Sequence, residues 1–197
     1  MRKLSSKQDE EKRRKRNQLI MGIILIGVMV VSTFAVIVDS FGNKDKTSNN
    51  NYNGYEFVKQ GSYWYTSIGE RSFVFMYNPY EVQESFNTTF TNITYISSYN
   101  GYPLYVYSEN YQAESEIFRN FEGISLRMQR ACLNSSYGLN CSEEFPIKDC
   151  SSNFIVIKES NERKIYNEEN CVFITGAKED LIKLTDEYLF KITGIKD

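Results

Sequence analysis

The sequence predicts an α+β protein in which an N-terminal transmembrane helix precedes one extracytoplasmic domain with an antiparallel sheet and two amphipathic helices. Three observations lead to this fold class. A basic cluster precedes a long apolar run, short aromatic-rich segments alternate with turn residues, and two later stretches carry apolar residues at helical spacing. We divide the 197 residues into a basic cytoplasmic tail (1–18), a transmembrane helix (19–38), a polar stalk (39–53) and an α+β domain (54–197).

The apolar run at residues 19–38 is long enough to cross a membrane. It holds 20 residues, of which only Ser32 and Thr33 have polar side chains, and a helix of that length extends about 30 Å, the thickness of a bilayer core. A cleaved secretory signal would have a shorter apolar region and a small-residue cleavage site, and a soluble core helix would alternate with polar positions. We therefore expect a retained anchor, with a cleaved signal and a buried helix as the alternatives.

The charges beside this run predict its orientation. Residues 12–16 are all lysine or arginine, and such residues close to a transmembrane end stay in the cytoplasm, so residues 39–197 are expected outside. The lipid bilayer is then the first expected partner. The outer part holds 15 basic and 22 acidic residues, a net charge of −7, which argues against nucleic acid as a partner. We interpret the basic cluster itself as topogenic rather than as a nucleic-acid patch.

The outer domain combines strand and helix patterns. Short segments rich in Tyr, Phe and Trp are separated by turn residues, which predicts strands. Apolar residues from Ile117 to Met128 recur at i, i+4, i+7 and i+11, which predicts a helix of about 20 residues. Those from Leu181 to Ile195 predict a last helix with Gly194 as its cap. The predicted strands are 54–59, 62–67, 71–77, 90–96, 103–108, 153–158 and 171–175.

All four cysteines, Cys132, Cys141, Cys150 and Cys171, lie in the part expected outside the membrane. An even number of cysteines in an oxidising compartment predicts disulfides rather than free thiols. The chain holds no histidine and no CxxC motif, so the common zinc patterns have no support, and we expect no metal or other cofactor. Four cysteines allow three connectivities, of which we favour the local one, 132–141 with 150–171.

A predicted hairpin also favours the pairing of Cys150 with Cys171. If residues 160–161 form a two-residue turn, Val156 faces Ile165, and the same register places the two cysteines opposite each other. Directly opposed strand positions lie within the range that a disulfide accepts. A second turn-like stretch just before Cys171 is the weak point of this hairpin.

Four N-glycosylation sequons begin at Asn87, Asn92, Asn134 and Asn140. They are candidate modification sites because the predicted topology places them outside the cell. Their number carries little weight, since a chain so rich in Asn, Ser and Thr contains nearly as many sequons by chance.

No catalytic motif is visible in the sequence. Without histidine neither a Ser-His-Asp nor a Cys-His system can be built, and the chain has no P-loop, GxSxG or GxGxxG motif. Neighbouring carboxylates do occur, and facing carboxylates can hydrolyse glycosides, but we expect these to be solvated surface charges. The pairs are Glu114/Glu116, Glu143/Glu144, Glu168/Glu169, Glu179/Asp180 and Asp186/Glu187.

Tyrosine is unusually frequent, with 15 in the chain. Half-buried strand positions explain most of these residues. A recognition surface is the alternative, because tyrosine offers rigid amphipathic area for binding at low entropic cost.

Several segments resemble an uncharacterised family of single-pass membrane proteins from small-genome archaea. They are the early YEF and WYT strands, the segment FxFxYNPYEV, the block from PIKDC to NEENCVFI and the terminal KLTDEYLFKITGI. The resemblance covers most of the outer domain. It implies an archaeal cell surface and a compact disulfide-bonded domain, and it supplies no catalytic residues.

The sequence therefore favours a non-catalytic, membrane-anchored binding or assembly domain, with another envelope or cell-surface protein as its expected partner. The alternative is a carboxylate-dependent hydrolase that acts on surface glycans. A cleft with two acidic side chains about 5–10 Å apart, lined by Tyr or Trp, would favour the enzyme. A flat aromatic patch or an apolar helix face would favour the binding domain.

Protease added to intact cells should remove the outer domain and spare the N-terminal tail, because the basic cluster keeps that tail inside. Immunoblotting with one tag at each end measures both fragments. A mature chain that begins near Ser40 would instead identify residues 19–38 as a cleaved signal, and the anchor would be rejected.

Overall fold

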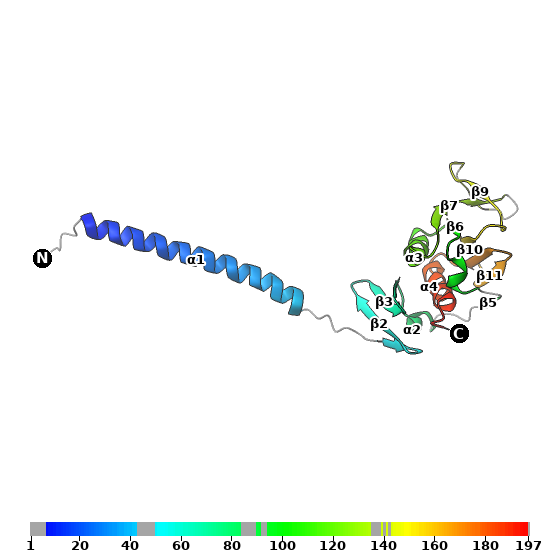
Figure 1. The fold of residues 1–197 in the computed structure, drawn as a ribbon, viewed down its shortest axis with the longest axis horizontal. Helices are drawn as coiled ribbons and strands as arrows, with labels where there is room; N and C mark the ends of the chain where they lie inside the picture. The colour runs from blue at the N-terminus through cyan, green and yellow to red at the C-terminus, as the bar shows by residue number, and fades with distance from the viewer. Residues whose placement is uncertain are drawn as a thin grey trace. The chain divides into compact units, whose positions relative to one another are not determined.

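The computed structural model describes residues 7–42, 50–83, 90–91, 94–134, 139, 141 and 143–196. The chain divides into two compact units, Met1–Lys46 and Thr47–Asp197. Each unit is drawn in Figure 1 and is described separately below.

The first unit contains one long helix, α1 (Lys7–Gly42), of 36 residues. It covers the whole apolar run 19–38, so the helical conformation of that run is confirmed. Large apolar side chains such as Leu19, Met21 and Met29 are exposed on it. Within the part of the chain that the structure describes, no helix is long and apolar enough to cross a membrane. Membrane insertion of this segment stays a prediction.

The second unit begins with a four-stranded antiparallel sheet in the order β1-β2-β3-β4. This meander confirms the antiparallel sheet that the sequence predicts. Its first turn is Asn53-Gly54, where both residues have positive φ (49° and 85°), as a tight hairpin turn requires. The sheet therefore begins inside the predicted stalk. The strands are β1 (Asn50–Tyr52), β2 (Tyr55–Gln60), β3 (Tyr63–Ile68) and β4 (Arg71–Phe75).

A second, six-stranded sheet is mostly parallel, which the sequence analysis did not predict. Its order is β5-β11-β12-β10-β6-β7, and only the β11–β12 pair in it is antiparallel among the described strands. A short parallel pair, β8–β9, is separate from it. The strands are β5 (Phe90–Thr91), β6 (Pro103–Ser108), β7 (Arg127–Arg130), β8 (Cys132–Leu133), β9 (Ile147–Lys148), β10 (Phe154–Glu159), β11 (Lys164–Glu168) and β12 (Cys171–Gly176).

The two predicted helices are present, but the first is shorter than expected. Helix α3 (Tyr111–Phe121) has 11 residues, because Gly123 adopts a φ of 70° and turns the chain back. Met128 therefore lies in β7 and not in a helix. Two short helical segments, α2 (Pro79–Gln83) and η1 (Ile96–Tyr99), precede α3.

Helix α4 (Leu181–Ile192) confirms the last predicted helix and its cap. Gly194 has a φ of 76°. The backbone N–H of Ile195 donates to the carbonyl oxygen of Phe190, and the N–H of Gly194 donates to that of Lys191. These two bonds form the Schellman motif that commonly ends a helix at glycine.

Helices α3 and α4 lie between the two sheets (Figure 1). On one side, Phe190 of α4 contacts Phe57 and Phe75 of the four-stranded sheet, with ring centroids 6.0 and 4.6 Å apart. On the other side, alternate residues of the six-stranded sheet, such as Val106 and Ile155, join the same buried core. The residues that alternate with these along the strands point to the opposite face of the six-stranded sheet. They form a second core there, which includes Tyr105, Tyr107, Phe154, Val156 and Phe173.

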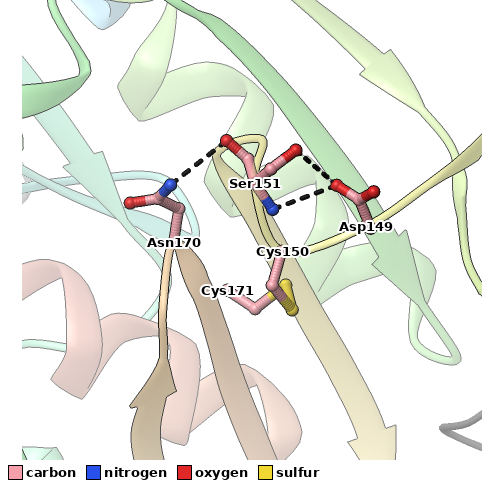
Figure 2. Close-up of a disulfide and its surroundings, with 5 residues drawn as sticks. All are labelled: Asp149, Cys150, Ser151, Asn170 and Cys171. Carbon is pink, nitrogen blue, oxygen red and sulfur yellow. Dashed lines mark hydrogen bonds between the residues drawn. A yellow bond between two sulfur atoms is a disulfide. The ribbon is translucent and has the colours of Figure 1, made fainter.

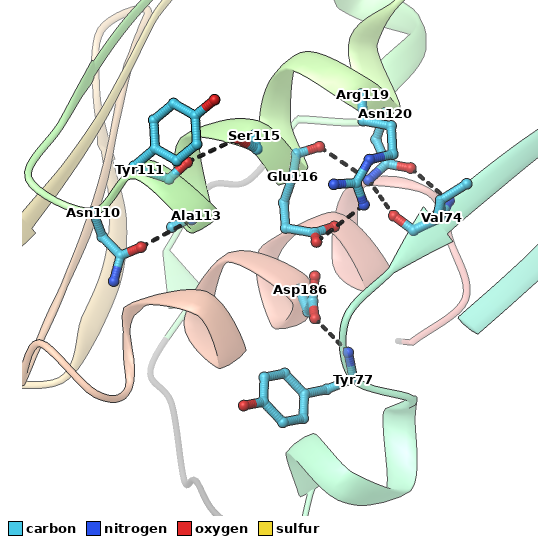
Figure 3. A network of polar contacts seen from close by, with 10 residues as sticks. All are labelled: Val74, Tyr77, Asn110, Tyr111, Ala113, Ser115, Glu116, Arg119, Asn120 and Asp186. Carbon is cyan, nitrogen blue, oxygen red and sulfur yellow. Dashed lines mark hydrogen bonds and ion pairs between the residues drawn. The ribbon is translucent and has the colours of Figure 1, made fainter. Parts of the chain in front are cut away.

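Polar side chains of the helices pair with the free edge of β4. The amide of Asn120 in α3 accepts from the backbone N–H of Val74 at 2.9 Å and donates to its carbonyl oxygen at 2.7 Å (Figure 3). Just beyond the end of β4, Asp186 in α4 accepts from the N–H of Tyr77 at 2.9 Å. Because β4 ends its sheet, these contacts satisfy backbone groups that no neighbouring strand can reach.

The hairpin expected between Val156 and Ile165 is wrong. Strand β12 lies between β10 and β11, so Val156 pairs with Phe173, and Ile165 pairs with Ile174. The turn-like stretch before Cys171 is the true hairpin turn, and Glu169 in it has a φ of 51°. The chain therefore reverses both between β10 and β11 and again at this second turn, which places β12 between the two strands.

Both favoured disulfides are nevertheless present, Cys132–Cys141 and Cys150–Cys171, with Cα–Cα distances of 5.8 and 5.0 Å. Figure 2 shows the contacts beside the second one. The side-chain amide of Asn170 donates to the carbonyl oxygen of Ser151 at 3.1 Å. The backbone N–H of Asn170 donates to the carbonyl oxygen of Cys150, also at 3.1 Å. These loop contacts, rather than a hairpin register, bring the two cysteines together.

The glycosylation sequons are only partly covered by the structure. Asn134 is described and exposed. Asn87, Asn92 and Asn140 lie outside the described residues, so their use stays a prediction.

Replacing Asn120 with alanine should lower the free energy of unfolding by about 2 kcal/mol, because two backbone groups of Val74 lose their partner. The control is Asn161→Ala, an exposed turn residue, which should change it by less than about 0.5 kcal/mol. Urea unfolding of the full chain in detergent, followed through the fluorescence of buried Trp64, measures both. Equal effects of the two substitutions would show that Asn120 does not join the layers.

Candidate functional site

The best-placed site lies at the carboxyl ends of β6 and β10, which are parallel neighbours. After β6 the chain continues through α3 to β7, which lies on one side of the β6–β10 pair in the strand order. After β10 the chain continues to β11 and β12, which lie on the other side of that pair. Strand order therefore reverses between these two strands. In open α/β sheets, ligands bind outside the carboxyl ends of the strands at such a point.

Two adjacent hollows open at this end of the sheet. The first has a volume of about 660 Å³ and the second about 520 Å³. They share Tyr111, Glu114, Arg130 and Phe145, and we refer to the two together as the cleft. Besides these four, the cleft is lined by Tyr107, Ser108, Glu109, Phe118, Met128, Glu144 and Glu159, among others.

A two-point ion pair lies where the hollows meet. Both guanidinium contacts from Arg130 to the two carboxylate oxygens of Glu114 measure 2.5 Å. The Glu114 side chain is 7% exposed and that of Arg130 is 48% exposed. The hydrogen bond that Arg130 donates to Glu114 raises the pKa of Arg130 above its ordinary value. Both oxygens of Glu114 are thus occupied by the guanidinium.

The strand ends supply a second fixed carboxylate. Glu109 accepts from the hydroxyl of Tyr107 at 3.2 Å and from the backbone N–H of Glu159 at 2.6 Å, so it joins the ends of β6 and β10. The next residue, Asn110, caps α3 by accepting from the N–H groups of Gln112 and Ala113. The cap starts the helix at the rim of the cleft.

Aromatic side chains complete the lining. Tyr111 is 74% exposed, and the guanidinium of Arg130 lies 5.9 Å from its ring centre. Phe145 lies on the segment between Cys141 and β9. That segment is fixed by the Cys132–Cys141 disulfide and by the N–H of Cys132, which donates to the carbonyl oxygen of Pro146 at 2.9 Å.

The side chains that line the cleft are more typical of a binding site than of a catalytic acid–base site. It brings acidic side chains together with tyrosines, as the hydrolase alternative requires. However, both oxygens of Glu109 and of Glu114 have partners, and Glu159 lies 3.5 Å from Lys178. Carboxylate oxygens held by donors in this way are suited to orienting a ligand.

The expectation of solvated carboxylates is wrong for four residues of the predicted pairs, namely Glu114, Glu116, Asp186 and Glu187, which are all buried. Each has a local reason to be buried. Glu114 binds Arg130, Glu116 binds Arg119, Asp186 accepts from Tyr77, and Glu187 binds Lys196 at 2.9 Å. Of these partners, only Arg119 could have been identified from the sequence, because it follows Glu116 by three residues on the same helix.

The remaining predicted pairs lie apart from one another. Glu144 lines the second hollow, Glu169 is exposed in the β11–β12 turn, and Asp180 binds Arg163 at 2.7 Å. Across the described ranges, no group of three or more His, Cys, Asp or Glu side chains is arranged to hold a metal ion.

No family model, curated protein or solved structure matches the chain. The resemblance to an archaeal membrane-protein family therefore remains a prediction.

Substituting Arg130 with methionine should lower the free energy of unfolding by about 1–2 kcal/mol, because Glu114 stays buried without its partner. The double variant Arg130→Met/Glu114→Gln should recover most of this loss, since no unpaired charge remains. Urea unfolding of the wild type, both single variants and the double variant gives the coupling energy. Simple additivity of the two substitutions would contradict a stabilising role for the pair.

Proposed function

We propose that the chain is a membrane-anchored, extracytoplasmic and non-catalytic binding domain that recognises another envelope or cell-surface protein through the cleft. The observation that carries this proposal is the pair of hollows at the point where strand order reverses, lined by fixed carboxylates and an exposed tyrosine. Rigid polar groups beside an aromatic side chain are typical of recognition sites.

Charge favours a basic segment as the bound part of the partner. Four glutamates line the cleft, and Arg130 is the single cation among its described lining residues, while Lys178 outside the lining lies 3.5 Å from Glu159. The four are Glu109, Glu114, Glu144 and Glu159. Arg130 is already paired with Glu114. A lysine or arginine of the partner would complement the remaining negative charge, and its alkyl stem would pack against Tyr111 and Phe145.

Two features support the proposed location. The described apolar side chains of α1 are exposed on several sides of the helix, and such a surface needs a cover, for which a bilayer is suited. The two disulfides of the outer domain fit an oxidising compartment. The N-terminus would lie in the cytoplasm and the domain at the cell surface, in agreement with the resemblance to archaeal single-pass proteins.

Replacing Tyr111 with alanine should reduce recovery of the partner about tenfold when the full chain is captured from native membranes, because exposed aromatic residues at the centre of a site carry much of the binding energy. The matched control is Tyr95→Ala, since Tyr95 is similarly exposed (69%) and does not line the cleft. Quantitative mass spectrometry of co-purifying chains measures the difference. Equal recovery with both variants would exclude the cleft as the binding site.

A further inference from the structure

Two buried carboxyl groups face each other between α3 and α4. Glu116 belongs to α3 and Asp186 to α4, and both residues are 0% exposed. Figure 3 shows the two carboxyl groups pointing toward each other across the helix interface. They do not line the cleft and have no part in the proposed function.

Each carboxyl group has one oxygen with a partner and one without. Oε1 of Glu116 lies 3.2 Å from the Arg119 guanidinium, and Oδ2 of Asp186 accepts from the N–H of Tyr77 at 2.9 Å. Oε2 of Glu116 and Oδ1 of Asp186 have no hydrogen-bond partner among the described residues. A buried oxygen without a donor is unfavourable, and two of them on facing groups indicate a proton between them.

The charges around the pair cannot neutralise two carboxylates. Arg119 is the cation that faces it, and its side chain is 30% exposed and also stacks on Tyr63 of β3 at 4.5 Å. Lys183 of α4 lies over the Tyr77 ring at 5.2 Å. Glu187, also in α4, forms an ion pair with Lys196.

Among the described residues, those of α2, β6, β10 and β12 that face the helices add no cation to the pair. In α2, Glu81 accepts from the backbone N–H of Asn78 at 2.8 Å. The residues that β6, β10 and β12 turn toward the helices are apolar, as Val106, Ile157 and Ile174 illustrate. Two negative charges would therefore face one partly exposed arginine in an otherwise apolar layer.

Burial accordingly favours the protonated form. Desolvation raises the pKa of Glu116 to about 7, against the opposing effect of Arg119. Desolvation and the nearby Glu116 together hold the pKa of Asp186 well above its ordinary value. A bound metal ion is a poor alternative, because two free oxygens beside a guanidinium are too few ligands for Ca²⁺ or Mg²⁺.

We propose that Glu116 and Asp186 share one proton between Oε2 and Oδ1, and that this proton is needed for α3 to pack tightly on α4, which makes the outer domain sensitive to pH. In the protonated state the pair carries one negative charge, balanced by Arg119. When the pH rises the proton passes to water, and two carboxylates repel each other inside the core.

The direction of the pH dependence follows from the raised pKa. A carboxyl group that is easier to protonate in the folded state adds stability at low pH, and this contribution is lost as the pH rises from the unfolded-state value of about 4.5 through the folded value of about 7. The domain should thus be more stable at about pH 5 than at about pH 8, opposite to the usual effect of salt-bridged carboxylates.

Urea unfolding of the full chain in detergent at these two pH values tests the proposal. The unfolding equilibrium constant of the wild type should be at least about tenfold larger at the higher pH. Glu116→Gln, whose amide can donate to Asp186 without titrating, should remove this difference. The matched control is Glu187→Gln, which alters a neighbouring buried carboxylate that has a lysine partner and should leave the difference in place.

Infrared spectroscopy of the folded protein provides a second measurement that does not depend on how well the variants fold. At about pH 6, where ordinary carboxyl groups are ionised, the wild type should show the carbonyl band of a protonated acid, and this band should disappear by about pH 8. Absence of the band, a stability independent of pH, or a pH dependence retained in Glu116→Gln would each overturn the proposal.

Discussion

The rest of the outer domain depends on one constraint, which is that the helices α3 and α4 have a sheet on each side. Helix α4 is almost wholly buried and α3 is buried along its inward side, so polar side chains at inward positions must find partners inside the domain. Asn120 finds its partner on the free edge of β4, and Asp186 finds its partner at Tyr77, just beyond the end of that strand. These hydrogen bonds cover the edge of the four-stranded sheet and fix its distance from the helices. The same bonds therefore provide partners for buried polar side chains of the helices and join the helices to that sheet.

The same constraint places the cleft. Since the middle of the helical layer is filled, the cleft opens where that layer ends, at the first turn of α3. There the cap at Asn110, the carboxylate of Glu109 and the ion pair of Glu114 with Arg130 all lie within a few residues of strand ends. Their geometry is set by backbone elements rather than by mobile loops, which suits them for orienting a bound segment.

Much of the outer domain could be predicted from its sequence, because strands such as 103–108 and the helix before Gly194 have strong local signals. The disulfide pairing was also right, although Cys150 meets Cys171 through loop contacts and not through the expected hairpin. Strand order could not be predicted, since inserting β12 between β10 and β11 depends on contacts far apart along the chain. The cleft was missed for the same reason, because Glu114 and Arg130 lie on different elements.

Helix α3 connects the two unusual features of the domain. Its first turn carries Tyr111 and Glu114 to the cleft, while Glu116, half a turn further on, faces Asp186 in the core. These side chains therefore lie on one continuous helix of 11 residues. A change in its packing on α4 would therefore shift the side chains at the cleft as well. If the cleft binds a partner, proton binding at the buried pair and partner binding at the cleft must influence each other to the same extent, because coupling between two sites is reciprocal.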